Sequence, residues 1–455
     1  MELNTIQFFK EIAKIPRESG NEKQIAEYLC QFAEERNLFY EQDQYHNVLI
    51  KKKTAHKEPI ILQVHTDMVC EREEGKVIDF AKDAIEVIEE NGYLKAKGTT
   101  LGADNGIGVA QILAILDSDI PCNIEAIFTA TEETSMIGAM NFDVSKLEGK
   151  KLLNLDGFEE NVILIESACF YDIILKLNNR FSKPRRQNTY NIILGGMEGG
   201  HSGFEIDKKR GNSSIELAKL LEKIEDIEIS DFVGGTKFNV IPSQAKAKIM
   251  TNLTERKMKK LCQDMQKELQ ANYPKIKVTS VCNNIKEEVL DTQQSKEFLQ
   301  KIIQFPHGVF YRNENQEVTT SVNLGVVNLQ EQKFKVGMRS SKESEEQECL
   351  QVLKSYSEQF QLDFTIIGSQ PGFESNPNSS LIQELLKSHP IEEFKEFPKL
   401  KSVHITVEVG FFKQKIPNLQ IAIISPNIQG AHTIKECVEI DSIKKVDKWL
   451  MNFIE

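Results

Sequence analysis

The sequence lacks several features that mark whole classes of protein. Its most apolar segment, residues 161–177, is interrupted by Glu166 and Asp172, so it has no run that could span a bilayer. It also lacks an excess of positive charge, since 56 Lys and Arg against 68 Asp and Glu give a net charge of −12. This balance argues against nucleic acid, and against an anionic membrane surface, as the main partner.

Cysteines with metal or redox spacing are missing too. The eight cysteines are scattered without a CxxC pair, which in a long chain indicates reduced thiols, some of them buried, rather than a disulfide framework. The first twenty residues have no secretory signal pattern. They instead place Ile6, Phe9, Ile12 and Ala13 on one stripe of an amphipathic helix. We therefore expect a cytoplasmic protein.

The first part of the chain alternates helix-like and strand-like segments. At 455 residues with 40% hydrophobic content, the chain has room for two or three domains. Alternation of this kind favours an α/β sheet, whose ligands gather at the carboxyl ends of the strands. Helices are expected over 21–36 and 106–119, and strands over 47–52, 59–67, 123–133 and 151–157.

The pattern changes near residue 180. Polar, proline-containing connectors lie at 181–189 and 369–380, and the intervening chain carries long charged helices, such as 213–227 and 254–270. A helix at 381–389 and strand-like runs at 401–410 and 419–425 follow. We predict an α+β domain over 181–373 inserted into a split α/β domain formed by 1–180 and 374–455, with a mixed sheet flanked by helices.

Acids and histidines stand at the ends of the predicted strands. His65 and Asp67 are two apart in a strand and project from one face. Taken alone, this pair is more often a surface pair than a metal-bound imidazole with an orienting carboxylate. Asp104 lies among glycines at a helix start, where an ordinary N-cap is the simpler interpretation. Those glycines match neither a Walker loop nor GxGxxG.

Four more residues complete the set. Glu132 and Glu133 are neighbours, which serve one site only where a strand ends and turns. Asp156 follows an apolar strand, and His432 lies in a glycine-containing loop near the end of the chain. Two divalent ions sharing one carboxylate need a bridging acid plus a histidine and an acid each, which leaves one glutamate as the base for a water activated between the ions.

These motifs resemble a known family. GTTLGADNGIG (98–108), TATEE (129–133), GGHSGFEI (199–206) with RGN (210–212), and the glycine–histidine segment ending at His432 resemble the cytosolic aminoacyl-histidine dipeptidases. These Xaa-His, carnosinase-like enzymes belong to the di-zinc peptidases and aminoacylases. The resemblance runs along essentially the whole chain. It implies a zinc-peptidase-like catalytic domain with the inserted domain as a lid.

The resemblance implies a role for each strand-end residue. One metal would be bound by His65, Asp104 and Asp156, and the other by Asp104, Glu133 and His432. Glu132 would be the general base, and Asp67 would lie behind His65 and Glu132. A non-proline cis peptide, frequent in this family, would fall at Asp104–Asn105.

The same resemblance assigns substrate-binding residues. His201 would stabilise the tetrahedral oxyanion. Asn239 and Arg339 would hold the substrate carboxylate, which the planar guanidinium can meet with two hydrogen bonds. His404 and Glu408 would recognise the substrate amine or support the site. The family's usual tryptophan after Pro-Gly is replaced by Phe373, which leaves substrate preference open.

The expected function is hydrolysis of unblocked dipeptides, Xaa-His types such as β-Ala-His or Gly-His above all, with two divalent ions as cofactors. Zn²⁺ is the default, and Mn²⁺ or Co²⁺ would also suit nitrogen and oxygen ligands. The alternatives are a tripeptidase, an N-acyl amino acid amidohydrolase, or a non-catalytic peptide-binding descendant. A homodimer and a monomer are both open.

Overall fold

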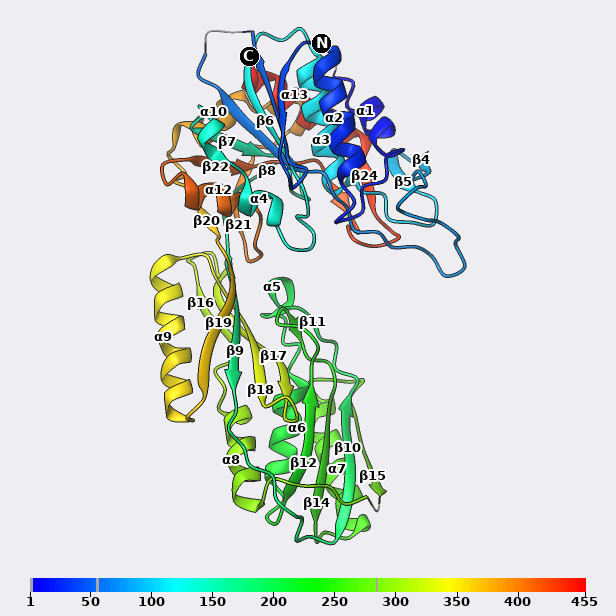
Figure 1. The fold of residues 1–455 in the computed structure, drawn as a ribbon, viewed down its shortest axis with the longest axis vertical. Helices are drawn as coiled ribbons and strands as arrows, with labels where there is room; N and C mark the ends of the chain where they lie inside the picture. Colours follow the sequence, from blue (N-terminus) through cyan, green and yellow to red (C-terminus); the bar gives the residue numbers. More distant parts are fainter. Residues whose placement is uncertain (1–2, 55–56, 284) are drawn as a thin grey trace. The chain divides into compact units, whose positions relative to one another are not determined.

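The computed structural model describes residues 3–54, 57–283 and 285–455, which form two compact units. The first unit contains the described residues up to Ser167 together with Pro371–Val403 and Val407–Glu455. The second contains Ala168–Gln370 and the short segment His404–Thr406. Figure 1 shows the blue and red ends of the chain in the first unit and the green and yellow middle in the second.

The chain therefore leaves the first unit after Ser167 and re-enters it at Pro371. The division from the sequence alone placed these boundaries at 180 and 373. Between the two versions of the first boundary lies strand β9 (Cys169–Lys176), which pairs with strands of the second unit. The assignment of a catalytic domain and a lid stays a prediction.

A mixed sheet forms the centre of the first unit, in the order β1-β2-β6-β3-β7-β22-β8-β20, with β21 also pairing β8. Its strands are β1 (Phe39–Gln42), β2 (Val48–Lys53), β3 (Ile60–His65), β6 (Asn123–Thr129), β7 (Lys151–Asn154), β8 (Val162–Ser167), β20 (Phe373–Glu374), β21 (Lys399–Val403) and β22 (Gln420–Ile423). A smaller sheet joins β4 (Val87–Glu90), β5 (Tyr93–Ala96), β23 (Ile428–Gln429) and β24 (Cys437–Glu439).

The strands that matter for the site are β6, β3, β7 and β22, which are neighbours and all parallel. Their residues are buried almost throughout, as expected of parallel strands covered on both faces. Their carboxyl ends therefore meet along one edge, where polar residues follow each strand.

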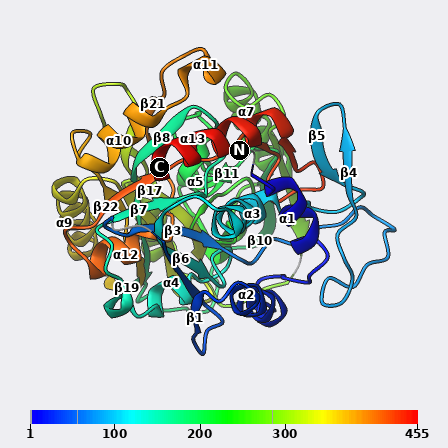
Figure 2. The same cartoon turned by 90° about the horizontal axis from the view of Figure 1, so that it is seen from above.

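Helices cover this sheet. Helix α3 is buried along nearly its whole length because its residues are apolar on every side, and α1 packs beside it (Figure 2). The helices of this unit are α1 (Thr5–Ile12), α2 (Lys23–Glu35), α3 (Ala103–Asp117), α4 (Ile137–Asn141), α10 (Ser380–Ser388), α11 (Ile391–Phe394), α12 (Val409–Lys415), α13 (Ile440–Ile454) and a 3-10 turn, Val144–Lys146. Trp449 of α13 lies fully buried in this core.

The second unit is built on an antiparallel sheet in the order β15-β10-β14-β12-β17-β18-β9-β19, with β16 also pairing β17. Besides β9, its strands are β10 (Asn188–Gly195), β12 (Glu228–Gly234), β14 (Ala245–Thr251), β15 (Lys277–Asn283), β16 (Gly308–Arg312), β17 (Val318–Asn328), β18 (Lys333–Ser340) and β19 (Asp363–Gln370). The short strands β11 (Gly200–His201) and β13 (Val240–Ile241) pair separately.

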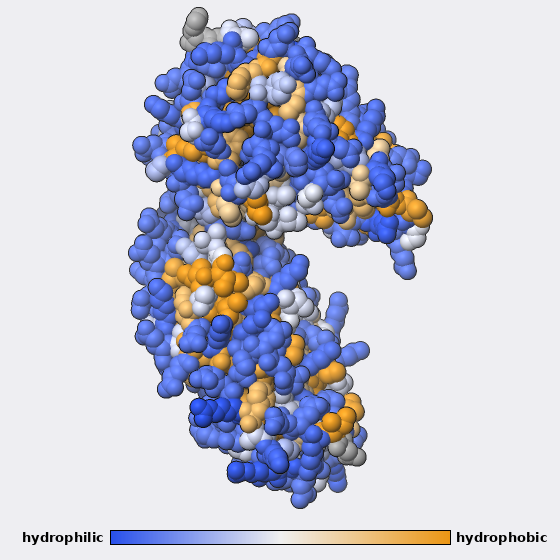
Figure 3. Space-filling model, viewed as in Figure 1, coloured by the Kyte–Doolittle hydropathy of each residue, from blue (hydrophilic) through white to orange (hydrophobic). Residues whose placement is uncertain are grey.

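Amphipathic helices pack on this sheet around a second core. They are α5 (Ser202–Glu205), α6 (Ser213–Glu222), α7 (Glu255–Gln270), α8 (Thr292–Ile303) and α9 (Glu343–Gln359). The charged helix α7 buries only a stripe of Met258, Cys262, Met265 and Leu269. The face shown in Figure 3 is mostly hydrophilic, and apolar side chains gather on it over the edge strand β19, which exposes Ile366 and Ile367.

The predicted fold class is confirmed, with a mixed sheet flanked by helices and a second, α+β unit. The strand predicted over 401–410 is wrong in its second half. Strand β21 ends at Val403 and helix α12 begins at Val409, and the β-branched residues between them, which favour strands, instead lie in an irregular bend. All eight cysteines are free thiols, as expected. Within the described ranges, every helix is too short or too polar to cross a membrane.

Candidate active site

The strand-end residues converge at the carboxyl edge of the first unit's parallel strands. His65 ends β3, the Glu132–Glu133 pair follows β6, and Asp156 follows β7. Asp104 lies in the first turn of α3, and His432 lies in the loop between β23 and β24. Residues far apart in the sequence are therefore brought together by the parallel order of the strands.

The first group consists of His65, Asp104 and Asp156. Their ligand-type atoms all lie within 4.8 Å of one another, and none of the three side chains is more than 10% exposed. His65 Nε2 is 3.1 Å from Asp104 Oδ1 and 3.7 Å from Asp156 Oδ1. The side chain of Asn105 donates to Asp156 Oδ1 at 2.9 Å and to the Leu155 carbonyl at 2.8 Å, which fixes the direction of the aspartate.

The second group consists of Asp104, Glu133 and His432, again within 4.8 Å. His432 Nε2 is 3.0 Å from Asp104 Oδ2 and 2.9 Å from Glu133 Oε1. Asp104 thus offers one oxygen to each group, as a bridging carboxylate would. The peptide bond after it, Asp104–Asn105, is cis, as the family resemblance predicted.

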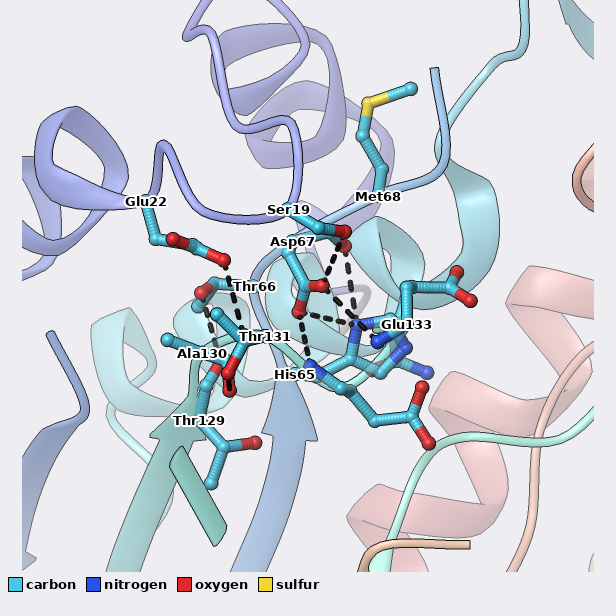
Figure 4. Close-up of polar contacts among 12 residues, drawn as sticks. Ser19, Glu22, His65, Thr66, Asp67, Met68, Thr129, Ala130, Thr131 and Glu133 are labelled. Atoms are coloured by element: carbon cyan, nitrogen blue, oxygen red, sulfur yellow. Dashed lines mark hydrogen bonds and ion pairs between the residues drawn. The ribbon is translucent and has the colours of Figure 1, made fainter. Parts of the chain in front are cut away.

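Asp67 contacts residues of both groups without belonging to either. Its Oδ1 accepts a hydrogen bond from the Glu132 backbone N–H at 2.9 Å, and its Oδ2 accepts from the Glu133 N–H at 3.2 Å. Oδ1 also lies 3.4 Å from Nδ1 of His65. Ser19 donates its hydroxyl to Oδ2 at 2.7 Å, so Asp67 lies between Ser19 and His65 in Figure 4. One buried carboxylate therefore orients a histidine and both glutamates.

Three acids of the site, Glu132, Glu133 and Asp156, resist ionisation. Burial raises the pKa of Glu132 well above its ordinary value, and Asp156, Glu408 and Glu133 add to that rise while His65 opposes it. Burial also raises the pKa of Glu133 and of Asp156. This crowding of carboxylates costs free energy unless positive charge balances it.

The imidazoles supply part of that balance. Hydrogen bonds with His432 and His65 hold the pKa of Asp104 below its ordinary value, although burial acts against ionisation. Contacts with Asp104 and Glu133 raise the pKa of His432 to about 11. Burial lowers the pKa of His65, but Asp156 and Asp104 outweigh it and raise the pKa well above 6.5. Cations at the two groups would offset the same negative charge.

Glu408 lies in the first unit with no exposed surface. Its Oε1 accepts from Gln63 Nε2 at 2.5 Å and from Thr129 Oγ1 at 2.7 Å, which anchors it to β3 and β6. Burial raises its pKa to about 7, despite the opposing effect of His65. Of the two roles considered from the sequence, this position favours support of the site over contact with a substrate amine.

His201, Arg339 and His404 form a cluster within the second unit. Arg339 is 4% exposed, its guanidinium stacks 4.3 Å from the Phe170 ring centroid, and its Nη2 lies 3.4 Å from His201 Nε2. Its Nη1 donates to Thr406 Oγ1 at 3.2 Å. Burial lowers the pKa of Arg339 to about 10, which still leaves it charged.

The other two predicted substrate residues are placed as follows. His404 Nε2 is 2.7 Å from Ser321 Oγ, and burial, with Arg339 and His201 nearby, lowers the pKa of His404 to about 3, so its ring is neutral. Asn239 lies just before β13, where its carbonyl accepts from the Ser202 N–H at 2.9 Å. The side chain of Asn323 donates to the carbonyls of Phe238 and Val240, the two residues that flank Asn239.

Several of these supporting residues were not predicted from the sequence. Ser19, Asn105 and Asn323 act through hydrogen bonds to partners that are distant in the sequence, and no local sequence pattern predicts such bonds. Arg17 and Glu436 are missed for the same reason, and both lie buried next to the Asp104 turn. Each stands next to another charged residue, Glu18 and Lys435, so the local sequence gives no signal of burial.

Comparisons with known proteins agree with the fold and show the family. The sequence profile described as Peptidase family M20/M25/M40 matches residues 61–455. The cytosol non-specific dipeptidase of Escherichia coli (strain K12) is 31% identical over 457 residues, which cover 96% of this chain and 93% of that protein.

Solved structures extend the likeness to the whole chain. The aminoacylhistidine dipeptidase from Vibrio alginolyticus matches with a TM-score of 0.83 and 28% identity, covering 99% of this chain and 96% of that one. The metallo-carboxypeptidase Sso-CP2 from Sulfolobus solfataricus matches with a TM-score of 0.56 and 15% identity over 99% and 98% of the chains, which shows a shared fold alone.

Proposed function

Because the chain belongs to Peptidase family M20/M25/M40, it is a peptide-bond hydrolase, and we propose that it cleaves unblocked dipeptides at a site for two divalent metal ions. The observation that carries this proposal is the pair of three-residue groups that share Asp104. Dipeptidase action is also the activity in the names of its relatives from E. coli and V. alginolyticus.

The residues present fit such a metal pair. Each group offers one imidazole nitrogen and two carboxylates, a set that zinc accepts and that manganese or cobalt would also suit. Burial raises the pKa of Glu133 and Asp156, and bound cations would supply the positive charge that these carboxylates need in order to ionise. Two bound cations would polarise the scissile carbonyl and lower the pKa of a water molecule shared between them.

Glu132 is the proposed general base. Its backbone is fixed by Asp67, and its raised pKa suits a group that must accept a proton and then release it. As water adds to the carbonyl carbon, Glu132 takes one of its protons. When the carbon–nitrogen bond breaks, Glu132 returns that proton to the leaving amine. Asp67 acts on this step only by holding the Glu132 backbone and the His65 ring.

Residues of the second unit would hold the substrate. We assign the oxyanion to His201 and the substrate carboxylate to Arg339 and Asn239. Arg339 is suited to this because its guanidinium keeps its charge while buried and presents paired N–H donors. His404, neutral and held by Ser321, would add a directional contact rather than a charge.

The dipeptide preferred is a finer question. The two relatives carry different specificities in their names, one non-specific and one for aminoacyl-histidine, and our proposal favours Xaa-His substrates such as β-Ala-His or Gly-His. A tripeptidase and an N-acyl amino acid amidohydrolase use the same site chemistry and are the alternatives. The E. coli relative's name also supports a cytosolic location. The homodimer stays a prediction.

A substrate panel tests the proposal. Protein freed of metal and then reconstituted with Zn²⁺, Mn²⁺ or Co²⁺ is assayed on β-Ala-His, Gly-His, other dipeptides, tripeptides and N-acetyl amino acids. We expect metal-dependent cleavage of free dipeptides, fastest with histidine at the second position. Faster cleavage of tripeptides or N-acetyl amino acids would replace the dipeptide assignment, and a lack of hydrolysis with every metal would indicate a non-catalytic descendant.

A further inference from the structure

Two buried charged residues of opposite sign contact the turn that carries Asp104, and the proposed chemistry uses neither. Arg17 is 2% exposed and Glu436 is 3% exposed. They come from opposite ends of the sequence, one from the segment after α1 and the other from the loop between β23 and β24. Burying a charge is costly, so a pair retained here must be compensated by specific contacts.

Glu436 collects the backbone N–H groups of the turn. Its Oε2 accepts from Leu101 at 2.8 Å and from Gly102 at 2.9 Å, and its Oε1 accepts from Asp104 at 3.2 Å. Hydrogen bonds to an ionised carboxylate are stronger than neutral ones. Glu436 also lies four residues after His432, so a single short segment supplies both an imidazole and the group that holds the turn opposite it.

Arg17 collects backbone carbonyls. Its Nη2 donates to the Gly102 carbonyl at 2.5 Å, and its Nη1 donates to the carbonyls of Thr66 at 3.0 Å and Asp67 at 3.2 Å. Figure 4 shows the chain at Thr66, Asp67 and Met68, where β3 has just ended in His65. One guanidinium therefore ties the end of β3 to the Asp104 turn.

The glycines of this turn make room for the guanidinium. A Cβ atom on Gly102 would lie 2.5 Å from Arg17 Nη2, and one on Gly106 would lie 2.6 Å from the same atom. Two of the glycines around Asp104, which match no phosphate-binding motif, therefore allow the close approach of an arginine to the backbone.

We propose that Arg17 and Glu436 are positioning residues that hold Asp104 where its two oxygens serve both metal groups. This inference rests on the proposed function, since it concerns the same metal pair. The two charges link three segments that each carry a proposed ligand: the end of β3 with His65, the turn with Asp104, and the loop with His432. Burial lowers the pKa of Arg17, and among the carboxylates Glu436 does most to oppose that shift.

The test is metal affinity rather than activity alone. Glu436→Gln keeps the shape but turns one acceptor oxygen into a donor facing N–H groups, and Arg17→Met removes all three donated hydrogen bonds. Substitution of a group that orients a metal ligand typically lowers metal affinity or activity about 10–100-fold. We expect each variant to bind Co²⁺ about 10–100-fold more weakly by calorimetric titration, and to change the visible absorption of the bound Co²⁺.

Matched controls separate positioning from general stability. Glu125 is a buried glutamate that accepts from the Glu148 and Gly149 N–H groups, and Lys52 is a buried cation that donates to the Ile115 and Ser118 carbonyls. Both lie in the first unit, outside the two metal groups. Glu125→Gln and Lys52→Met should lower the free energy of unfolding while leaving Co²⁺ affinity and spectrum unchanged.

The outcomes separate the two ideas. If the unaltered protein binds no metal and cleaves no peptide, the proposed function fails. If the unaltered protein binds Co²⁺, and folded Glu436→Gln and Arg17→Met bind it with unchanged affinity and spectrum, the positioning roles are overturned while the proposed function stands. Arg17→Lys, which keeps the charge with fewer fixed donors, should fall between the unaltered protein and Arg17→Met. Equal loss in the controls would also overturn the proposal.

Discussion

Glu132 and Glu133 are chemically identical neighbours with different surroundings. Glu133 lies 2.9 Å from His432 and belongs to the second metal group, whereas Glu132 belongs to neither group and has the more strongly raised pKa. Two substitutions of the same size should therefore have different effects. This is the sharpest expectation at the scale of single residues.

Glu132→Gln should lower kcat by at least 10²–10⁴-fold, the range that general bases contribute, while two metal ions stay bound. Glu133→Gln should lower activity and also reduce the metal content toward one ion per chain, because a neutral amide is a poorer ligand. Metal analysis after dialysis, alongside kinetics at saturating dipeptide, measures both. Metal loss from Glu132→Gln, or full activity in either variant, would contradict the division of roles.

His307 provides a second prediction, on acid stability. Its Nδ1 accepts a hydrogen bond from the Leu324 N–H at 3.2 Å, and burial lowers its pKa from 6.5 to about 4. Below pH 6.5 the unfolded chain takes up a proton that the folded ring binds only near pH 4. The free energy of unfolding therefore falls as the pH drops across this interval, by about 1.4 kcal/mol for each unit of pKa difference.

His307→Asn isolates this effect, because an amide oxygen can accept the same hydrogen bond without titrating. Urea unfolding from pH 7 to pH 4 should show a smaller loss of stability in the variant than in the unaltered protein. Since all other titratable groups are shared, the difference between the two curves reports His307. Parallel curves over the whole range would show that the folded ring titrates normally.

At the scale of elements, the turn before α3 depends on Gly102. Its φ is +69°, and a Cβ there would also lie 2.6 Å from Met68 Sδ. Gly92, in the turn between β4 and β5, has a φ of +81° with nothing within 4 Å of an added Cβ. The two positions therefore share the backbone strain of a left-handed residue but differ in crowding.

Gly92→Ala should cost about 1–2 kcal/mol of unfolding free energy from conformation alone. Gly102→Ala should cost about 1–3 kcal/mol more, because overpacking displaces Arg17 or the turn, and it should also weaken metal binding. Urea unfolding and Co²⁺ titration of the two variants measure these differences. Equal destabilisation with unchanged Co²⁺ affinity would show that the space beside Gly102 adapts freely.

The sequence was sufficient for the elements whose pattern is local. Apolar strands ending in acids predicted β3, β6 and β7, and since these strands are parallel neighbours, their ends had to meet. The strand expected over 401–410 was wrong in its second half, because β-branched residues also occur in turns. The hydrogen bonds of Glu436 could not be predicted, because they join residues more than 300 positions apart.

At the scale of the whole molecule, the two units have separate cores, and both metal groups belong to the first. The chain has one tryptophan, Trp449, fully buried in the first unit's core, where its indole N–H donates to the Leu385 carbonyl. Tryptophan fluorescence therefore reports unfolding of the unit that would bind metal, whereas far-UV circular dichroism reports both units.

Metal should stabilise the first unit, because a ligand that binds only the folded state adds RT ln(1 + [L]/Kd), about 2.7 kcal/mol at a hundredfold excess over Kd. Adding Zn²⁺ to metal-free protein should thus raise the midpoint seen by Trp449 fluorescence. A circular dichroism transition attributable to the second unit should move less. Asp104→Asn, which weakens the ligand shared by both groups, should abolish most of the fluorescence shift. An equal shift in that variant would mean that the stabilising metal binds elsewhere, and the absence of any shift in the unaltered protein would remove the metal pair from the account of this site.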